Sequence, residues 1–224
     1  MIPRGVIFDL DGTLLDTLDD IRAVVNEILS EEGLDTHDRE TYRLEVGRGL
    51  ENLLRRLLQR QREEAPDERV DALAARVRSL YLMEGDRRTR PYEGIGEVLD
   101  RLSERSVPVA VLSNKPNDSA VAAVRRFFPH HPFSCIRGAE PGSVPKPAPD
   151  AALEIAAGCL GCAPREVAFV GDTAVDMRTA VAAGMLPVGV LWGFRDSAEL
   201  ESGGAAVLVG RPPELIGVLL GGER

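Results

Sequence analysis

The stretch Gly5-Val6-Ile7-Phe8-Asp9-Leu10-Asp11-Gly12-Thr13 joins a short apolar run to a polar turn with two carboxylates. A continuous apolar run of this length is typical of a strand that is buried on both faces of a sheet. Similar runs follow at residues 109–112, 167–170 and 187–191, and amphipathic helical patterns separate the later ones. Alternating strands and helices predict right-handed crossovers, and hence a parallel sheet covered by helices on both faces.

A different pattern occupies the segment between the first two strands. Residues 16–90 contain four amphipathic helical patterns and no convincing strand. We therefore predict an all-helical domain, residues 16–90, inserted after the first strand. The remaining residues, 1–15 and 91–224, are predicted to form a Rossmann-like, doubly wound α/β core.

Composition and charge narrow the functions that this chain can have. Its 224 residues carry a formal net charge of −9 with a pI of about 5.0, so we expect neither a nucleic-acid partner nor attraction to acidic lipid. A charge follows the N-terminus too early for a signal peptide, and no apolar run is long enough to span a membrane. Three cysteines, an odd number, favour a reducing compartment, so we predict a cytoplasmic protein.

Lysine is rare in this chain. Only two of the 27 basic residues are lysines, Lys115 and Lys146. Each is therefore a candidate for a role that needs a compact ammonium instead of a planar guanidinium, with chance survival at a tolerant position as the alternative. Two places are open to Lys115, namely the interface with the helical domain or the end of a helix.

Acidic residues directly follow two of the predicted strands. Ligands bind beyond the carboxyl ends of the strands in an open parallel sheet, so a site is expected there. Asp9 and Asp11 are two residues apart, and both carboxylates point to the same side of an extended chain. Asp172 and Asp176, one helical turn apart, bring further carboxylates to a neighbouring strand end. Four acidic oxygen donors with no nearby His or Cys favour a hard ion that keeps some of its water, and the predicted cofactor is Mg²⁺.

The same residue types suit phosphoryl transfer. A carboxylate beside a divalent ion can be a nucleophile, with one Asp attacking phosphorus and the other protonating the leaving oxygen. Lys146, whose backbone is restricted by Pro145 and Pro147, suits the role of holding the phosphoryl charge. Ser113 and Asn114, which follow another predicted strand, can donate hydrogen bonds to phosphate oxygens.

The order of these residues resembles that of the haloacid dehalogenase superfamily, in its phosphoglycolate phosphatase-like branch. The resemblance covers nearly the whole chain and rests on four motifs, Asp9-Leu10-Asp11-Gly12-Thr13-Leu14, Ser113-Asn114, Lys146-Pro147, and Gly171-Asp172-Thr173 with Asp176. It implies a helical cap between the first and second motifs, where the helical insertion is predicted. By this resemblance Asp9 is the nucleophile, Asp11 the general acid and base, and Ser113 and Lys146 hold the phosphate.

The resemblance also implies a set of metal ligands. Mg²⁺ is expected to be bound by Asp9, the carbonyl of Asp11, and Asp172. Asp176 is expected to support the metal-bound waters or to orient Lys146.

One loop of the predicted cap carries a further resemblance. Val46-Gly47-Arg48-Gly49-Leu50 is similar to the loop that meets the leaving group in phosphoglycolate phosphatase-like members. The alternative is an ordinary turn between helices with a solvent-facing arginine. A planar cation facing the pocket would suit a small carboxylate such as that of 2-phosphoglycolate. The residues predicted to contact substrate are Thr13, Arg48, Gly49 and Asn114.

Together, the motifs predict a Mg²⁺-dependent phosphatase that hydrolyses a small phosphate monoester through an aspartyl-phosphate intermediate, with 2-phosphoglycolate as the favoured substrate. Alternatives on the same scaffold are a pyrophosphatase, a sugar-phosphate phosphatase and a phosphosugar mutase resembling β-phosphoglucomutase. The mutase is disfavoured because such relatives usually carry a His shortly after the first motif, and residues 16–21 contain none. A non-catalytic regulator would be expected to lack a motif, and none is lost. The expected partner is a small phosphorylated metabolite, and the expected state is a monomer or homodimer.

Overall fold

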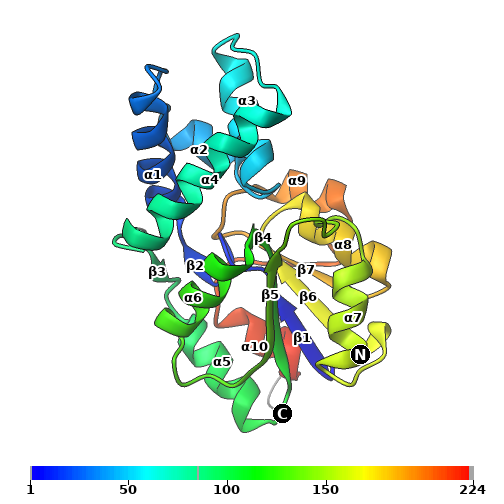
Figure 1. Cartoon of the computed structure of the whole chain (residues 1–224). Helices are drawn as coiled ribbons and strands as arrows, with labels where there is room; N and C mark the ends of the chain where they lie inside the picture. Colours follow the sequence, from blue (N-terminus) through cyan, green and yellow to red (C-terminus); the bar gives the residue numbers. More distant parts are fainter. Residues whose placement is uncertain (1, 85, 222–224) are drawn as a thin grey trace.

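The computed structural model describes residues 2–84 and 86–221, and its centre is a six-stranded sheet in the order β5-β4-β1-β6-β7-β8 (Figure 1). The strands are β1 (Gly5–Phe8), β4 (Val109–Pro116), β5 (Phe133–Ala139), β6 (Val167–Gly171), β7 (Leu186–Val190) and β8 (Val207–Val209). All neighbouring strands in it run parallel. The predicted doubly wound, Rossmann-like core is therefore confirmed.

Helices cover both faces of this sheet. Because successive side chains of a strand point to opposite faces, Val6 and Phe8 pack against one layer of helices and Ile7 packs against the other. The first layer consists of α5 (Ile95–Glu104), α6 (Asn117–Phe127) and α10 (Glu214–Leu220). The second consists of α7 (Asp150–Gly158) and α8 (Ala174–Ala183), with α9 (Ser197–Gly203) against α8 and a 3-10 turn, Pro164–Glu166, before β6.

Two strands, β5 and β8, lie outside the apolar runs that predicted the sheet. Both are edge strands, and most residues of β5 are only half-buried. An edge strand is covered less completely than a central one, so its sequence need not be a continuous apolar run. The central strand β4 differs in the opposite sense, because it continues four residues beyond the predicted 109–112.

Four helices form the insertion between β1 and β4. They are α1 (Leu18–Glu31), α2 (Arg39–Glu45), α3 (Leu50–Arg60) and α4 (Asp67–Glu84). Their buried side chains form a hydrophobic cluster of their own, distinct from the two clusters that flank the sheet. Figure 1 shows these helices above one end of the sheet, which confirms the predicted all-helical cap.

The chain enters and leaves the cap at one place. β2 (Leu15–Asp16) pairs antiparallel with β3 (Arg90–Pro91). Beside this ribbon, the buried carboxylate of Asp20 accepts hydrogen bonds from the N–H of Arg88 at 2.8 Å, and from the N–H and hydroxyl of Thr89 at 2.6 and 2.8 Å. We propose that the cap, residues 16–90, meets the core, residues 1–15 and 91–224, at this ribbon.

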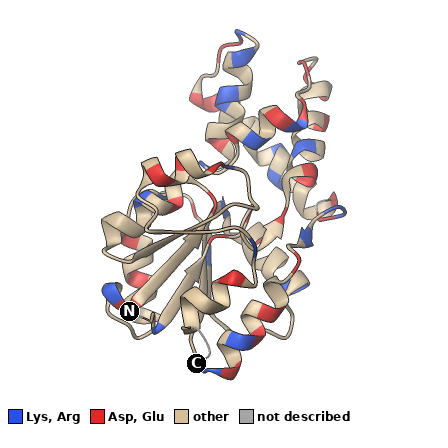
Figure 2. Ribbon diagram, turned by 180° about the vertical axis from the view of Figure 1, so that it is seen from behind, with Lys and Arg blue, Asp and Glu red and all other residues tan. Residues whose placement is uncertain are grey.

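Charged side chains lie mainly on the helices and loops (Figure 2). Within the strands of the six-stranded sheet, the only charged residues are Lys115 in β4 and Arg137 in β5. A charge in a central strand is unusual, and it draws attention to the carboxyl end of β4. Among the described helices, none combines the length and apolar character needed to cross a bilayer.

Replacing Asp20 by Ala is expected to lower the free energy of unfolding by about 2–4 kcal/mol, because the N–H groups of Arg88 and Thr89 lose a buried, charged acceptor. Asp19→Ala is the matched control, since the Asp19 side chain is 40% exposed and surface ion pairs are worth less than about 1 kcal/mol. Urea unfolding of both variants measures the difference. Equal losses of stability would contradict this role for Asp20.

Candidate active site

The carboxyl ends of two neighbouring strands, β1 and β6, bring predicted carboxylates together. Strands β4, β1 and β6 are adjacent in the sheet, and Asp9 follows β1 while Asp172 follows β6. Asp176 lies in the first turn of α8. One oxygen from each of these three side chains lies within 4.8 Å of the others, and all three residues are buried. The cluster therefore concentrates negative charge where water screens it poorly.

The ammonium of Lys146 lies within this cluster. Its Nζ atom is 2.9 Å from Asp9 Oδ1 and 2.7 Å from Asp176 Oδ1, and its side chain is only 2% exposed. The Asn114 side chain holds the Lys146 backbone by accepting from its N–H at 2.9 Å and donating to its carbonyl at 3.1 Å. Residues from all four sequence motifs thus meet around one cation.

One ammonium does not balance three buried carboxylates. Burial and the neighbouring Asp176 raise the pKa of Asp9 from 3.8 to about 7, although Lys146 opposes the shift. The pKa of Asp172 lies well above its usual range because of burial and of repulsion from Asp176 and Asp9. Burial alone would lower the pKa of Lys146, but Asp176 and Asp9 outweigh it and hold that pKa above its usual value. Asp9 and Asp172 therefore hold their protons to a higher pH than isolated carboxyl groups do.

The carboxylate of Asp172 is fixed from several sides. The Thr13 hydroxyl donates to its Oδ1 at 3.1 Å, and the Phe194 N–H donates to its Oδ2 at 2.8 Å. Gly12, at φ +87°, lies so close that a Cβ there would be 2.3 Å from Asp172 Oδ2. Thr13, predicted to contact substrate, is thus placed against Asp172. Residue type does not predict the contact between Phe194 and Asp172, because Phe194 acts through its backbone, although its place just after a strand puts it near the site.

Asp11 lies beside a different cation. Its Oδ1 is 3.1 Å from Lys115 Nζ, which also donates to the Tyr81 hydroxyl of α4 at 3.2 Å and lies 4.3 Å from the centroid of that ring. Burial raises the pKa of Tyr81 to about 12, so the phenol stays protonated and donates to Asp86 at 3.1 Å. Of the two places open to Lys115, the structure therefore shows the interface with the helical domain.

A pocket lies between these residues and the cap. Its core side is formed by Asp9, Asp11, Ser113, Asn114 and Lys115. Its cap side is largely apolar and includes Ile21, Val25, Val46, Leu50, Leu53 and Val77, with Arg78 and Tyr81 from α4. A pocket with polar residues on its core side and mostly apolar residues on its cap side is suited to a small ligand with a charged end.

The loop after α2 meets this pocket through its backbone. Gly47 and Gly49 line the pocket, and the Gly47 carbonyl accepts from Asn114 Nδ2 at 3.2 Å. Arg48 between them is exposed, and it is not among the described residues that line the pocket. The structure therefore brings Gly49 and Asn114 to the pocket, while contact between Arg48 and substrate stays a prediction.

Comparison with known proteins places this arrangement in a family. Residues 6–190 match the sequence profile described as haloacid dehalogenase-like hydrolase. A phosphoglycolate phosphatase from Xanthomonas campestris pv. campestris (strain 8004) is 33% identical over 215 residues, which is 95% of each chain. A phosphoglycolate phosphatase from Pseudomonas putida is 31% identical over 212 residues, 93% of this chain and 76% of the relative.

Solved structures agree on the fold. A protein from Lactobacillus delbrueckii subsp. bulgaricus superposes with a TM-score of 0.91 at 28% identity, covering 99% of this chain and 100% of the other. A β-phosphoglucomutase from Clostridium difficile superposes with a TM-score of 0.77 at 20% identity, covering 96% of this chain and 93% of the mutase. The second likeness concerns the fold alone.

In metal-free protein, Asp9→Asn is expected to raise the free energy of unfolding above pH 7 and to have little effect near pH 4. A carboxyl pKa that is raised in the folded state makes wild-type stability fall as the pH rises from about 4 to about 7. The neutral Asn does not titrate. The free energy of unfolding of Asp9→Asn should therefore rise relative to that of the wild type by roughly 1–4 kcal/mol over this pH interval. Thermal unfolding in EDTA between pH 4 and 8 measures it.

The control for this measurement is Asp71→Asn, at an exposed position of α4. It should shift stability equally little at every pH. If the difference in free energy of unfolding between Asp9→Asn and wild type does not change with pH, the pKa of Asp9 is not raised.

Proposed function

The chain belongs to the haloacid dehalogenase-like hydrolase family and is a phosphoric monoester hydrolase, and we propose that it is a Mg²⁺-dependent phosphatase acting on 2-phosphoglycolate. The observation that carries the chemistry is the cluster of Asp9, Asp172 and Asp176 around Lys146, from which Asp9 lines the pocket under the cap. The proposed substrate rests on the phosphoglycolate phosphatases that resemble this chain over nearly its whole length.

The donor set suits a magnesium ion. Asp9, Asp172 and Asp176 offer carboxylate oxygens within 4.8 Å of one another, and hard oxygen donors are what Mg²⁺ prefers. The raised pKa values of Asp9 and Asp172 indicate that the cluster lacks positive charge. We propose that Asp9, the Asp11 carbonyl and Asp172 hold the ion, with Asp176 beside it. When bound, the ion would neutralise these carboxylates and polarise a phosphoryl oxygen.

The chain's own side chains can carry both chemical steps. In the first, an Asp9 oxygen attacks phosphorus, the bond from phosphorus to the leaving oxygen breaks, and Asp11 gives that oxygen a proton. In the second, water attacks the same phosphorus and gives a proton to Asp11, and the bond between phosphorus and Asp9 breaks. Ser113 and Lys146 are proposed to hold the phosphoryl oxygens throughout, because Lys146 contacts Asp9 at 2.9 Å and Ser113 lines the same pocket as Asp9.

Three cations are candidates for the carboxylate of the proposed substrate. Lys115 and Arg78 line the pocket, and Arg48 lies in the loop whose glycines line it. Any of them could pair with a carboxylate at the end of the ligand that is remote from Lys146. A sugar phosphate or pyrophosphate has no such carboxylate, so it would gain nothing from this cation beyond general attraction.

We also propose a cytoplasmic location, because the chain has an odd number of cysteines and a reducing compartment keeps thiols free.

Asp9→Asn is expected to lower phosphate release at least about a thousandfold while leaving the fold intact, because an amide is neither a nucleophile nor a good ligand for Mg²⁺. EDTA should abolish wild-type turnover, and added Mg²⁺ should restore it. Phosphate release together with the melting temperature checks both statements. Turnover retained by Asp9→Asn would reject Asp9 as the nucleophile.

A panel of 2-phosphoglycolate, sugar phosphates, pyrophosphate and p-nitrophenyl phosphate tests the substrate. Removing a cation that pairs with the carboxylate, by Arg48→Ala or Arg78→Ala, should raise KM for 2-phosphoglycolate about tenfold and leave KM for p-nitrophenyl phosphate nearly unchanged. Arg87→Ala is the control, since Arg87 lies in the cap with a side chain that is 66% exposed. If activity is similar on all esters and neither substitution changes it, the phosphatase assignment stands and 2-phosphoglycolate is rejected as the substrate.

A further inference from the structure

One core segment contacts both the carboxylate cluster and the cap. We call residues 192–196, which follow β7, the bridging segment. Within it, the N–H of Phe194 donates to Asp172 Oδ2 at 2.8 Å. The side chain of the same residue is 2% exposed and belongs to the hydrophobic cluster of the cap helices. A single residue thus holds a carboxylate of the cluster with its backbone and packs into the cap with its ring.

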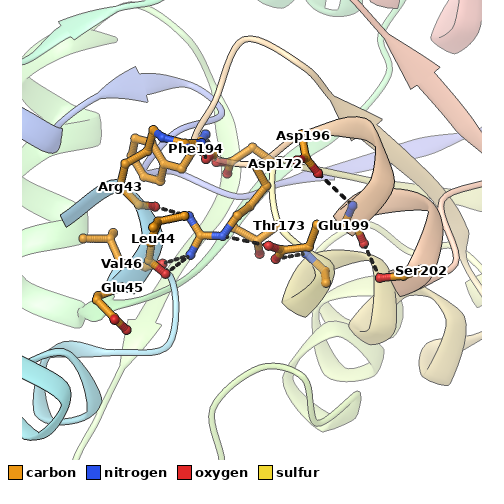
Figure 3. Close-up of polar contacts among 12 residues, drawn as sticks. Arg43, Leu44, Glu45, Val46, Asp172, Thr173, Phe194, Asp196, Glu199 and Ser202 are labelled. Carbon is orange, nitrogen blue, oxygen red and sulfur yellow. Dashed lines mark hydrogen bonds and ion pairs between the residues drawn. The ribbon is translucent and has the colours of Figure 1, made fainter. Parts of the chain in front are cut away.

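Arg195 extends this contact with a buried guanidinium. Its Nη2 donates to the carbonyls of Leu44 and Val46, both at 2.8 Å, and its Nη1 donates to the carbonyl of Arg43. Its Nε lies 3.1 Å from Glu199 Oε2. Figure 3 shows Arg43, Leu44 and Val46, at the end of α2, on one side of this contact and Glu199, in α9, on the other. The last carbonyls of a helix lack partners within it and carry partial negative charge, so a cation satisfies them well.

A second arginine makes the contact reciprocal. The Arg43 guanidinium, on the cap, donates to the carbonyl of Phe194 in the bridging segment. The Arg195 side chain therefore donates to the backbone of Arg43, and the Arg43 side chain donates to the backbone of Phe194. Packing alone does not require this arrangement, because an apolar side chain could fill the space without the cost of burying a guanidinium.

The cap residues held in this way form part of the pocket wall. Val46, whose carbonyl Arg195 binds, lines the pocket together with Gly47. On the other side, the bridging segment lies tightly against the cluster, because a Cβ at Gly193 would be 2.3 Å from Asp172 Cβ and 2.4 Å from the Gly12 carbonyl oxygen. The segment therefore has no free space in which to move without disturbing the surroundings of Asp172.

We infer that Arg195 is a positioning residue that couples the placement of residues 43–49, which include the pocket residues Val46, Gly47 and Gly49, to the orientation of the Asp172 carboxylate. A cation held by the cluster and a cap held over the pocket then stabilise each other, since both depend on the same position of the bridging segment. The inference rests on the proposed magnesium site, but not on the identity of the substrate.

Amide hydrogen exchange with and without MgCl₂ tests the coupling, with no substrate present. In the wild type, Mg²⁺ is expected to slow exchange at residues 43–50 about fivefold or more. Arg195→Met should lose this effect, and Arg195→Lys should restore part of it because an ammonium can still donate to one or two of the carbonyls. Arg4→Met is the control, since Arg4 is 70% exposed, pairs with Glu166 and precedes β1, away from the carboxyl end that carries the site.

The chain provides a second readout, because Trp192 is its only tryptophan and lies in the bridging segment. Its Nε1 donates to the Thr13 carbonyl at 3.0 Å. The Mg²⁺ concentration that half-saturates the fluorescence change should rise about fivefold in Arg195→Met. Should that variant fail to fold, Arg43→Met removes the reciprocal hydrogen bond from a side chain that is 32% exposed, and it is expected to weaken the same effects.

Calorimetric titration with Mg²⁺ separates the outcomes. Binding to the wild type without slower exchange at residues 43–50, or equal slowing in Arg195→Met, would overturn the coupling while leaving the proposed function standing. Absence of Mg²⁺ binding would reject the magnesium site and the coupling with it. If the phosphate-release panel rejects 2-phosphoglycolate as the substrate and Mg²⁺ still binds, the inferred coupling is unaffected.

Discussion

Three buried carboxylates around one buried ammonium form the constraint on which the rest of this structure depends. Asp9 and Asp176 meet Lys146 directly, and Asp172 lies beside them, held by the Thr13 hydroxyl and the Phe194 N–H. The site exists only because β1 and β6 are neighbours and end at the same edge of the sheet. Carboxylates this close to one another favour the binding of a further cation. The sheet topology, which brings them together, is therefore the reason that the site suits a metal ion.

Much of this arrangement could be predicted from the sequence. Continuous apolar runs identify the central strands, because those strands are buried on both faces, and the residue after each run must then lie at the carboxyl edge. That logic predicted the meeting of Asp9 with Asp172, and the scarcity of lysine singled out Lys146. The helical cap was predictable for a related reason, since four helical patterns in succession leave no strand to add to the sheet.

The parts that the sequence did not predict depend on how the cap is placed over the core. Tyr81 has the spacing of a core residue in an amphipathic helix, and its contact with Lys115 follows only from the packing of α4. Phe194 acts through its N–H, which leaves no trace in residue type. Arg195 is one of many arginines in a chain that uses them almost everywhere in place of lysine. Nor do half-buried edge strands such as β5 show the continuous apolar pattern of central strands.

The ribbon that closes the cap also bears on how quickly the chain can fold. Val6 of β1 pairs with Val109 of β4, although more than one hundred residues separate them, and contacts so distant in sequence slow folding. Because the cap has its own hydrophobic cluster and Leu15 lies opposite Pro91, a folded cap leaves only residues 9–15 and 91–108 as the loop between these strands. Loop-closure entropy therefore favours a folding order in which the inserted domain forms first, because the shorter loop lowers the entropic cost of pairing β1 with β4.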